Sequence, residues 1–223
     1  MKKLLCFAVF AGCLVLALTA CGGKDTGAST QKESTDTNST DEAKTDTTST
    51  EKKTLTKAGE SLKDPNVGTV TAYSVKDASN KSLQIGDLKI MFKDAKVLTM
   101  SDLTDDYKAT LEEAFGKKMN EVTFAQITYD IENVGSDEIK TWNGFETAVN
   151  SEGLQIDLRF NDTLGAANPA EMEILAGAKV PNNLVLVPVK KGESNVRIKA
   201  ADVLKDANAK DFLTRGKEIK IDL

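Results

Sequence analysis

Two stretches of the chain alternate apolar and polar residues, "FAQITYDIEN" (124–133), from Ala125 on, and "LQIDLRF" (154–160). Alternation with a period of two is typical of a strand that buries one face and exposes the other. The faces expected to be buried hold Ala125, Ile127, Tyr129 and Ile131 in the first stretch, and Leu154, Ile156, Leu158 and Phe160 in the second. Each stretch therefore predicts a half-buried strand.

Variants of this pattern predict further strands. "GDLKIMFKDAKVL" (86–98) alternates as far as Phe92 and changes phase at Lys93-Asp94, where a β-bulge would return the apolar set to the core. "NLVLVPV" (183–189) is apolar on both faces, which predicts a central or covered strand that ends at Pro188. "EIKIDL" (218–223) also alternates, and weaker strands are predicted over 69–75, 141–150 and 195–199.

Turn-forming residues separate these strands. "NVGSDE" (133–138) ends one strand, and "NSEG" (150–153) joins two others, with Gly153 suited to a positive φ. "KKGES" (190–194) joins two more. Strands spaced by roughly 10–15 residues and joined by such turns predict an antiparallel β-sandwich.

One segment has helical periodicity instead, "SDLTDDYKATLEEAFGKKM" (101–119). Its apolar positions are Leu103, Tyr107, Leu111, Ala114 and Phe115. Asp105 and Asp106 are expected in the first turn and Lys117 and Lys118 in the last, as the helix dipole favours. A second, short and poorer helix is predicted through "AADVLKDANAKDFL" (200–213).

The start of the chain has a different pattern. Lys2 and Lys3 precede an apolar run from Leu4 to Leu18, which at about 15 residues is shorter than the ~20 that cross a bilayer. Such a segment is typical of a secretory signal. Leu18-Thr19-Ala20-Cys21 resembles the bacterial lipoprotein box, which implies cleavage between Ala20 and Cys21 and diacylglycerol on the Cys21 thiol. A plain signal peptide with a chance cysteine is the alternative.

Residues 22–53 contain no aromatic residue and no Leu, Ile, Val or Met. A segment of this composition cannot bury enough apolar surface to offset its ordering entropy, so it is predicted to be a disordered tether. We therefore expect a signal peptide over 1–20, a lipidated cysteine and tether over 21–56, and one β-sandwich domain over 57–223.

Charge and cysteine content narrow the classes of partner. The formal charge is −5, and removal of Lys2 and Lys3 with the signal gives −5 − 2 = −7. An acidic surface disfavours the binding of nucleic acid. It also disfavours a basic patch that would bind anionic lipid. Cys6 and Cys13 leave with the signal, so the mature chain keeps only Cys21 and forms no internal disulfide. Attachment to the membrane is then expected through the lipid alone.

The chain has no histidine, which removes the commonest general base and metal ligand and disfavours triad and zinc chemistry. Carboxylates remain, crowded on the predicted helix at Asp102, Asp105, Asp106, Glu112 and Glu113. Two of them could serve a glycoside hydrolase, although a solvated helix start explains them better. A calcium site here or at Asn161-Asp162 is chemically allowed, but no EF-hand spacing supports it. No cofactor, metal or catalytic residue is predicted.

A contact surface is the remaining candidate. "IKTWNGFE" (139–146) holds the only tryptophan, Trp142, with Phe145 three residues later. An aromatic residue in a loop at the end of a sandwich is a common binding anchor. With so few aromatics in the chain, Trp142 is also a candidate core residue, capping the interior beside Phe145 or Phe160, and this interpretation is preferred. "LGAANPAEMEIL" (164–175) is a second candidate contact loop.

The quoted segments together resemble a family of Gram-positive surface lipoproteins whose domain has no assigned function. The most specific of them are the "YDIEN" strand end, the "EGLQID" hairpin and the Gly177 turn before the apolar strand. The domain of this family is similar to the immunoglobulin-like sandwich of mycobacterial immunoprotective extracellular proteins. The resemblance covers about residues 83–223, and it implies a mainly β, immunoglobulin-like antiparallel sandwich. The family carries no agreed catalytic or ligand residues, so none is transferred.

These observations favour a non-enzymatic binding or interaction module at the bacterial cell envelope. It is expected to be a monomer, held on the extracytoplasmic face of the cell membrane by the lipid on Cys21, with an envelope protein or polymer of unknown identity as partner. Two alternatives stay open. One is an envelope hydrolase that uses paired carboxylates, and the other is an accessory subunit of a transporter or wall enzyme.

Overall fold

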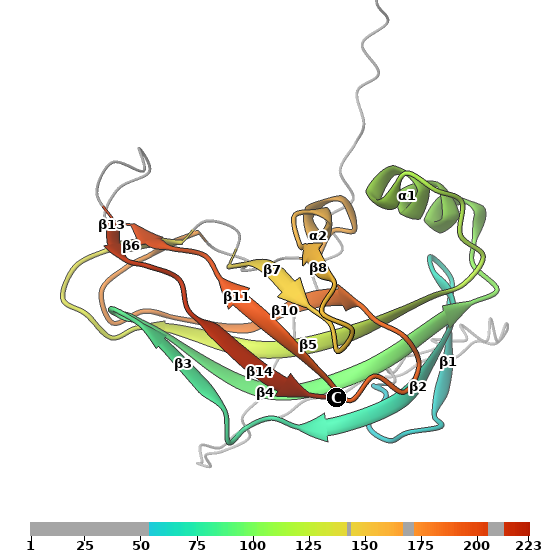
Figure 1. The fold of residues 1–223 in the computed structure, drawn as a ribbon, viewed down its shortest axis with the longest axis horizontal. Coiled ribbons are helices and arrows are strands. Elements are labelled where there is room, and N and C mark those ends of the chain that lie inside the picture. Colours follow the sequence, from blue (N-terminus) through green and yellow to red (C-terminus); the bar gives the residue numbers. More distant parts are fainter. Residues whose placement is uncertain (1–53, 142–143, 167–171, 205–211) are drawn as a thin grey trace, which may run out of the picture. The chain divides into compact units, whose positions relative to one another are not determined.

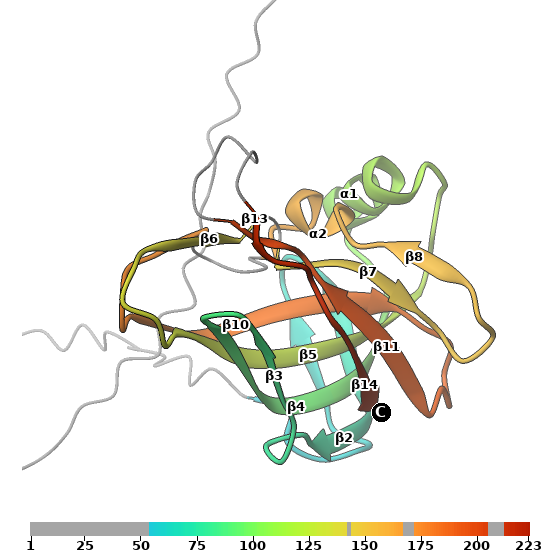
Figure 2. The ribbon, with the colours of Figure 1, turned by 60° about the vertical axis from the view of Figure 1, so that its left-hand side comes forward.

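The structure, a computed structural model, describes residues 54–141, 144–166, 172–204 and 212–223. In these residues, antiparallel sheets form two layers that face each other (Figures 1 and 2). One layer is a six-stranded sheet in the order β1-β2-β4-β5-β10, with β3 also paired to β4. Its strands are β1 (Ser61–Asp64), β2 (Gly68–Asp77), β3 (Ser82–Ile85), β4 (Leu88–Ser101), β5 (Val122–Asn133) and β10 (Lys179–Pro188).

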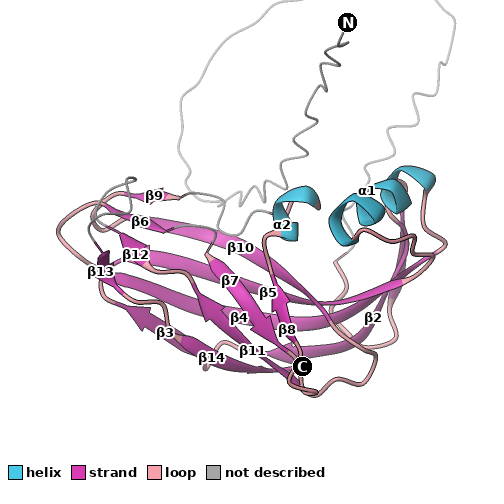
Figure 3. Ribbon diagram, turned by 45° about the horizontal axis from the view of Figure 1, so that its top comes forward, coloured by secondary structure: helices cyan, strands magenta, loops and turns pink. Residues whose placement is uncertain are grey.

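Two four-stranded sheets make the opposite layer. The first, in the order β14-β11-β7-β8, contains β7 (Phe145–Val149), β8 (Gln155–Asp157), β11 (Asn195–Ala200) and β14 (Glu218–Asp222). The second, in the order β13-β12-β6-β9, contains β6 (Ile139–Thr141), β9 (Glu173–Ile174), β12 (Val203–Leu204) and β13 (Phe212–Thr214). Two helices, α1 (Asp105–Phe115) and α2 (Phe160–Thr163), complete the described elements (Figure 3). The predicted fold class, a mainly β antiparallel sandwich with an inserted helix, is confirmed.

The longest predicted strands form as expected. The four apolar residues of β5 named above are all buried, at 0–2% exposure, and β5 lies between β4 and β10 in the sheet. The register between β4 and β5 shifts between Phe92 and Asp94, so the bulge predicted at Lys93-Asp94 is present. Because of this bulge, Phe92 and Ala95 both reach the core, at 2% and 0% exposure.

Helix α1 is inserted between β4 and β5, and its sequence explains both ends. The Thr104 side chain caps the first turn by accepting a hydrogen bond from the Tyr107 N–H. Gly116, in the left-handed conformation, ends the helix. Asp105 and Asp106 lie in the first turn as predicted. Lys117 and Lys118 do not lie in the last turn, because Gly116 stops the helix before them.

Two sequence-based expectations are wrong in detail, and a third holds in one of its two forms. In "LQIDLRF", the strand β8 covers only 155–157, Leu154 is 62% exposed, and Phe160 begins α2. The predicted helix over 200–213 is replaced by β12 and β13 where that segment is described. Of the two forms predicted for 183–189, a central or a covered strand, β10 is the covered one. Among the described residues it lies at the edge of its sheet, but Val185, Leu186 and Val187 are all buried, and it ends at Pro188 as predicted.

Two hydrophobic clusters lie on opposite faces of the large sheet. Consecutive residues of a strand point to opposite faces, and Phe124 and Ala125 of β5 belong to different clusters. The first cluster fills the space between the layers around the rings of Phe92, Tyr129 and Phe145, whose centroids are 5.1–6.2 Å apart. It contains buried residues of both four-stranded sheets, so both cover the same face of the large sheet.

The second cluster lies under the two helices. The rings of Phe115 on α1, Phe124 on β5 and Phe160 on α2 meet with centroids 4.9–6.2 Å apart. Leu55 is 6% exposed and belongs to the same cluster. Leu55, two residues before the predicted start of the domain at residue 57, therefore packs with this cluster.

Candidate functional site

The site residues proposed from the sequence fall in different settings. Ala20 and Cys21, the proposed cleavage and lipidation site, and Trp142 lie outside the described residues. Phe145 is 0% exposed and packs against Phe92 and Tyr129 in the first cluster. Its side chain is a core residue and cannot be a surface contact, because the ring is surrounded by other core side chains.

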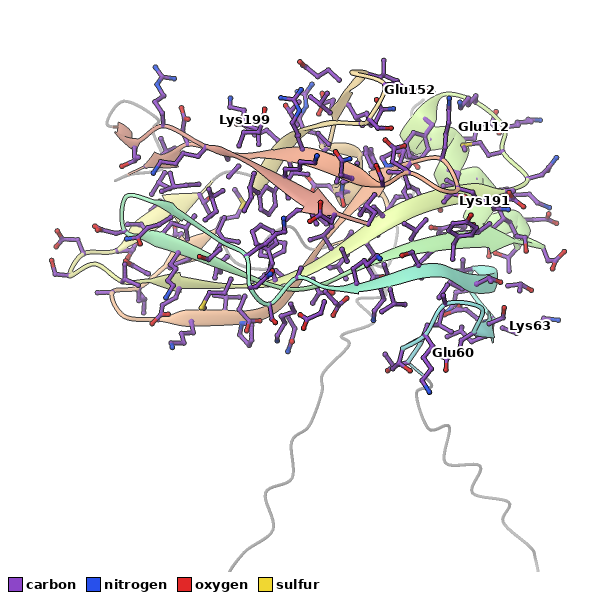
Figure 4. All side chains as sticks on the ribbon, turned by 60° about the horizontal axis from the view of Figure 1, so that its bottom comes forward. Glu60, Lys63, Glu112, Glu152, Lys191 and Lys199 are labelled. Carbon is purple, nitrogen blue, oxygen red and sulfur yellow. The ribbon has the colours of Figure 1, made fainter. Side chains whose placement is uncertain are left out.

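The carboxylates of the α1 region do not form a catalytic pair. All five of those proposed are exposed, and the Asp105 side chain is 98% exposed and pairs with Lys108 at 3.1 Å. Glu112 lies on the surface of the helix (Figure 4). Asp105 and Glu112 line a shallow depression of about 230 Å³ together with Lys108 and Lys118. An acid and base for glycoside hydrolysis need a shielded site, which this depression does not provide.

At the proposed calcium position Asn161-Asp162, the Asn161 side chain is engaged by other contacts. Asn161 is 1% exposed, and its side-chain amide bonds to the edge of β10, donating to the Leu186 carbonyl at 3.0 Å and accepting from the Leu186 N–H at 2.8 Å. It also donates to the Leu158 carbonyl at 2.9 Å, so its amide is committed to holding the chain and not a cation. Within the described part of the chain, no group of three Asp, Glu, Cys or His side chains is placed to hold a metal.

An apolar surface at one end of the sandwich is the strongest candidate site. We call it the apolar tip, and it consists of residues 133–138, between β5 and β6, and residues 172–178, around β9 and the turn that leads into β10. The two loops run beside each other at the left of Figures 1 and 2. Five large hydrophobic side chains are exposed among the described residues, and three of them are in the tip: Val134 (46%), Met172 (38%) and Leu175 (64%).

A buried asparagine holds the two loops of the tip together. Asn133 is 0% exposed, and its Nδ2 donates to the carbonyls of Asp137 at 2.7 Å and Ile174 at 2.9 Å. Its Oδ1 accepts from the Gly135 N–H at 3.0 Å, and its own backbone N–H donates to the Ala178 carbonyl at 3.0 Å. One residue therefore ties the 133–138 loop to the 174–178 turn by hydrogen bonds on both sides.

Glycines allow the close approaches within the tip. The Ala178 N–H donates to the Leu175 carbonyl at 3.0 Å, which closes a four-residue turn, and Gly177 has φ 69° in it. A positive φ at the third position is typical of a type II turn and favours glycine. A Cβ on Gly135 would lie 2.5 Å from the carboxyl carbon of Asp87, so a larger residue there would require the Asp87 side chain to move.

The rim of the tip is acidic. Within residues 133–138 and 172–178 the charged residues are Asp137, Glu138 and Glu173, and Asp87 adds a fourth carboxylate from the adjacent turn. Lys140 is a neighbouring cation, with Nζ 2.6 Å from Glu173 and 3.6 Å from Glu138. Lys179 also borders the tip, but it pairs with Glu132 at 3.2 Å, and this pair adds no net charge. The hydrogen bond to Glu173 raises the pKa of Lys140. Four carboxylates and one lysine give the tip a formal charge of −4 + 1 = −3.

Sequence patterns locate parts of the tip without assembling them. The 164–175 loop was predicted as a contact candidate, and it contains Met172 and Leu175 at its end. The 133–138 segment was predicted only as a turn. The hydrogen bond from Asn133 to Ile174 spans 41 positions, and no local pattern signals a contact over that separation.

The comparisons with known proteins add no function. No protein-family model matches the chain, and no curated protein matches it. Among solved structures, a functionally unknown protein from Listeria monocytogenes EGD-e is similar, with a TM-score of 0.45 and 10% sequence identity. The match covers 69% of this chain and 86% of that chain.

Proposed function

We propose that this protein is a lipid-anchored binding module on the extracytoplasmic face of a bacterial cell membrane, and that the apolar tip is its contact surface. The lipoprotein box at 18–21 supports the anchor, and the polar composition of 22–53 supports a tether between the anchor and the sandwich. As a flexible chain of about 30 residues, the tether would have a root-mean-square reach of ~30 Å.

The observation that carries the binding role is the apolar tip. Single exposed apolar residues are ordinary on protein surfaces, whereas a group of them within a polar rim is typical of an interaction site. Val134 and Leu175 project from loops that the buried Asn133 holds in place. Loops that are already ordered lose little conformational entropy when a partner binds, which favours affinity.

The two alternative functions have unequal support. An accessory subunit of a transporter or wall enzyme is one form that such binding would take. The envelope hydrolase has no supporting observation among the described residues, since the α1 carboxylates are exposed. Within the same residues, no helix is long and apolar enough to cross a membrane.

Metabolic labelling tests the anchor. The full-length chain and its Cys21→Ala variant are expressed in a Gram-positive host with an alkyne-tagged fatty acid, because the thiol of Cys21 is the expected attachment point. We expect label on the wild type and none on the variant, and digestion of the wild-type chain by protease added to wall-stripped cells. Equal labelling of both chains, or full protection from the protease, would refute the proposed location.

A further inference from the structure

We infer that the partner of the apolar tip is a protein segment that presents an apolar side chain flanked by lysine or arginine. The inference rests on the proposed function, and it adds the chemical class of the partner. It follows from the four carboxylates at the rim of the tip. In the described part of the chain, two of these carboxylates, Asp87 and Asp137, have no cation as an ion-pair partner.

The four rim carboxylates differ in their ion pairs. Glu138 and Glu173 share Lys140, at 3.6 and 2.6 Å. Asp87 and Asp137 pair with no cation in the residues that the structure describes. Both residues are exposed. Asp137 belongs to the 133–138 loop and Asp87 lies against Gly135 of the same loop, so both are open to a basic side chain of a partner that binds the tip.

The same charges disfavour other occupants. A second copy of this chain would bring a rim of formal charge −3 against a rim of −3, and like charges across an interface suppress association. An anionic lipid surface would be repelled in the same way. A basic partner is steered toward the tip, and its affinity is expected to fall as salt screens the rim over a Debye length of ~10 Å at 0.1 M.

Selection from a random peptide library on the full-length protein tests the inference, because it lets the tip choose its own ligand. The protein is immobilised in detergent through a C-terminal tag, and phage that display random peptides of about 12 residues are selected in about 50 mM salt. The affinity of the enriched peptides, made synthetically, is then measured by fluorescence anisotropy against the wild type and four variants.

Two variants change the tip, Leu175→Ser and Asp137→Lys, and two matched controls change similar residues elsewhere. Leu154→Ser replaces a leucine exposed to nearly the same extent, 62% against 64%. Glu113→Lys reverses an exposed carboxylate on α1. Because all four side chains are exposed, far-UV circular dichroism and the urea midpoint are expected to match the wild type for each variant.

We expect enriched peptides with Lys or Arg beside Leu, Ile, Val or an aromatic residue. Leu175→Ser and Asp137→Lys should each weaken their binding about ten-fold, a change typical of a central interface residue, and the controls should stay within about two-fold. Raising the salt to about 300 mM should weaken binding to the wild type more than to Asp137→Lys.

The contrary outcomes separate the two proposals. Enriched peptides that are acidic or uncharged, yet lose affinity with Leu175→Ser, would overturn the basic partner and leave the tip as the binding surface. Peptides whose affinity is unchanged by both tip variants, or no enrichment at all, would overturn the tip as a binding surface. Self-association of the wild type that Leu175→Ser abolishes would replace the basic segment with a second copy as the occupant.

Discussion

Asn133 is predicted to be the residue on which the geometry of the apolar tip depends, and Asn133→Ala tests it. The substitution removes three side-chain hydrogen bonds, to the Asp137 carbonyl, the Ile174 carbonyl and the Gly135 N–H. The backbone bond from Asn133 to Ala178 would remain. The sandwich is therefore expected to fold, with the two loops of the tip less firmly joined.

The size of the effect follows from the burial of each partner. Ile174 is 1% exposed, but it pairs with Ile139 across the β6–β9 ladder, so its carbonyl keeps one partner and the lost hydrogen bond costs about 0.5–1.5 kcal/mol. The groups of Asp137 and Gly135 lie nearer the surface and can bind water instead, at about 0.5–1.5 kcal/mol each. The sum predicts a loss of about 3 kcal/mol in the free energy of unfolding.

Urea unfolding followed by far-UV circular dichroism measures this loss. The control is Asn195→Ala, since the Asn195 side chain bonds only to its neighbour Ser194 among the contacts described and is expected to change stability by no more than about 0.5 kcal/mol. Asn133→Asp should destabilise at least as much as alanine at pH 7, because it would place a carboxylate oxygen against two carbonyls. A loss below about 1 kcal/mol for Asn133→Ala, or one equal to the control, would refute the role of Asn133.

Two further substitutions test packing and burial. Gly68→Ala is expected to cost about 2–4 kcal/mol, because Gly68 has φ 128° and a Cβ there would lie 2.6 Å from the carbonyl oxygens of Ser101 and Asp102. Gly59→Ala, with φ 86° but no atom within 4 Å of the new Cβ, should cost only about 1 kcal/mol in the same urea assay, and equal costs would contradict the steric argument. Burial, with a smaller effect of Asp64, raises the pKa of Tyr107 to about 12 in the folded chain. In the unfolded chain the phenol ionises near pH 10, so the contribution of Tyr107 to the free energy of unfolding is full below about pH 10 and is lost as the pH rises from about 10 towards 12. Between about pH 9 and about pH 11.5, the free energy of unfolding of Tyr107→Phe should therefore fall by about 1 kcal/mol less than that of the wild type. Parallel falls in the two proteins would show that the phenol is not buried.

The sequence by itself determined the elements whose cause is local. In β4 and β5 the alternation of apolar residues gives the strand and its buried face, and the change of phase at Lys93-Asp94 gives the bulge. The ends of α1 follow from Thr104 and Gly116, which act within one turn of the chain. The strands, the bulge and the first turn of α1 were predicted correctly, because the interactions that decide them join residues close in sequence. The end of α1 at Gly116 was not predicted, although its signal is equally local.

Only the tertiary structure decided the features that depend on distant contacts. The alternation in "LQIDLRF" predicts a strand over all seven residues, but the observed strand is shorter. It ends early because Phe160 packs against Phe115 and Phe124 and begins α2. Among the described residues, β10 is an edge strand despite its apolar sequence, and the side chain of Asn161, 25 positions away, covers its edge at Leu186.

The apolar tip is the clearest example of this difference. From the sequence, Asn133 is a polar residue at the start of a turn and Leu175 is an apolar residue near a strand. In the folded chain the polar residue is buried, with 0% exposure for Asn133, and the apolar residue is exposed, with 64% for Leu175. The reason is physical: a buried amide is stable only where it finds partners, and the partner of Asn133 at Ile174 comes from a segment that only the packing of the two layers brings beside it.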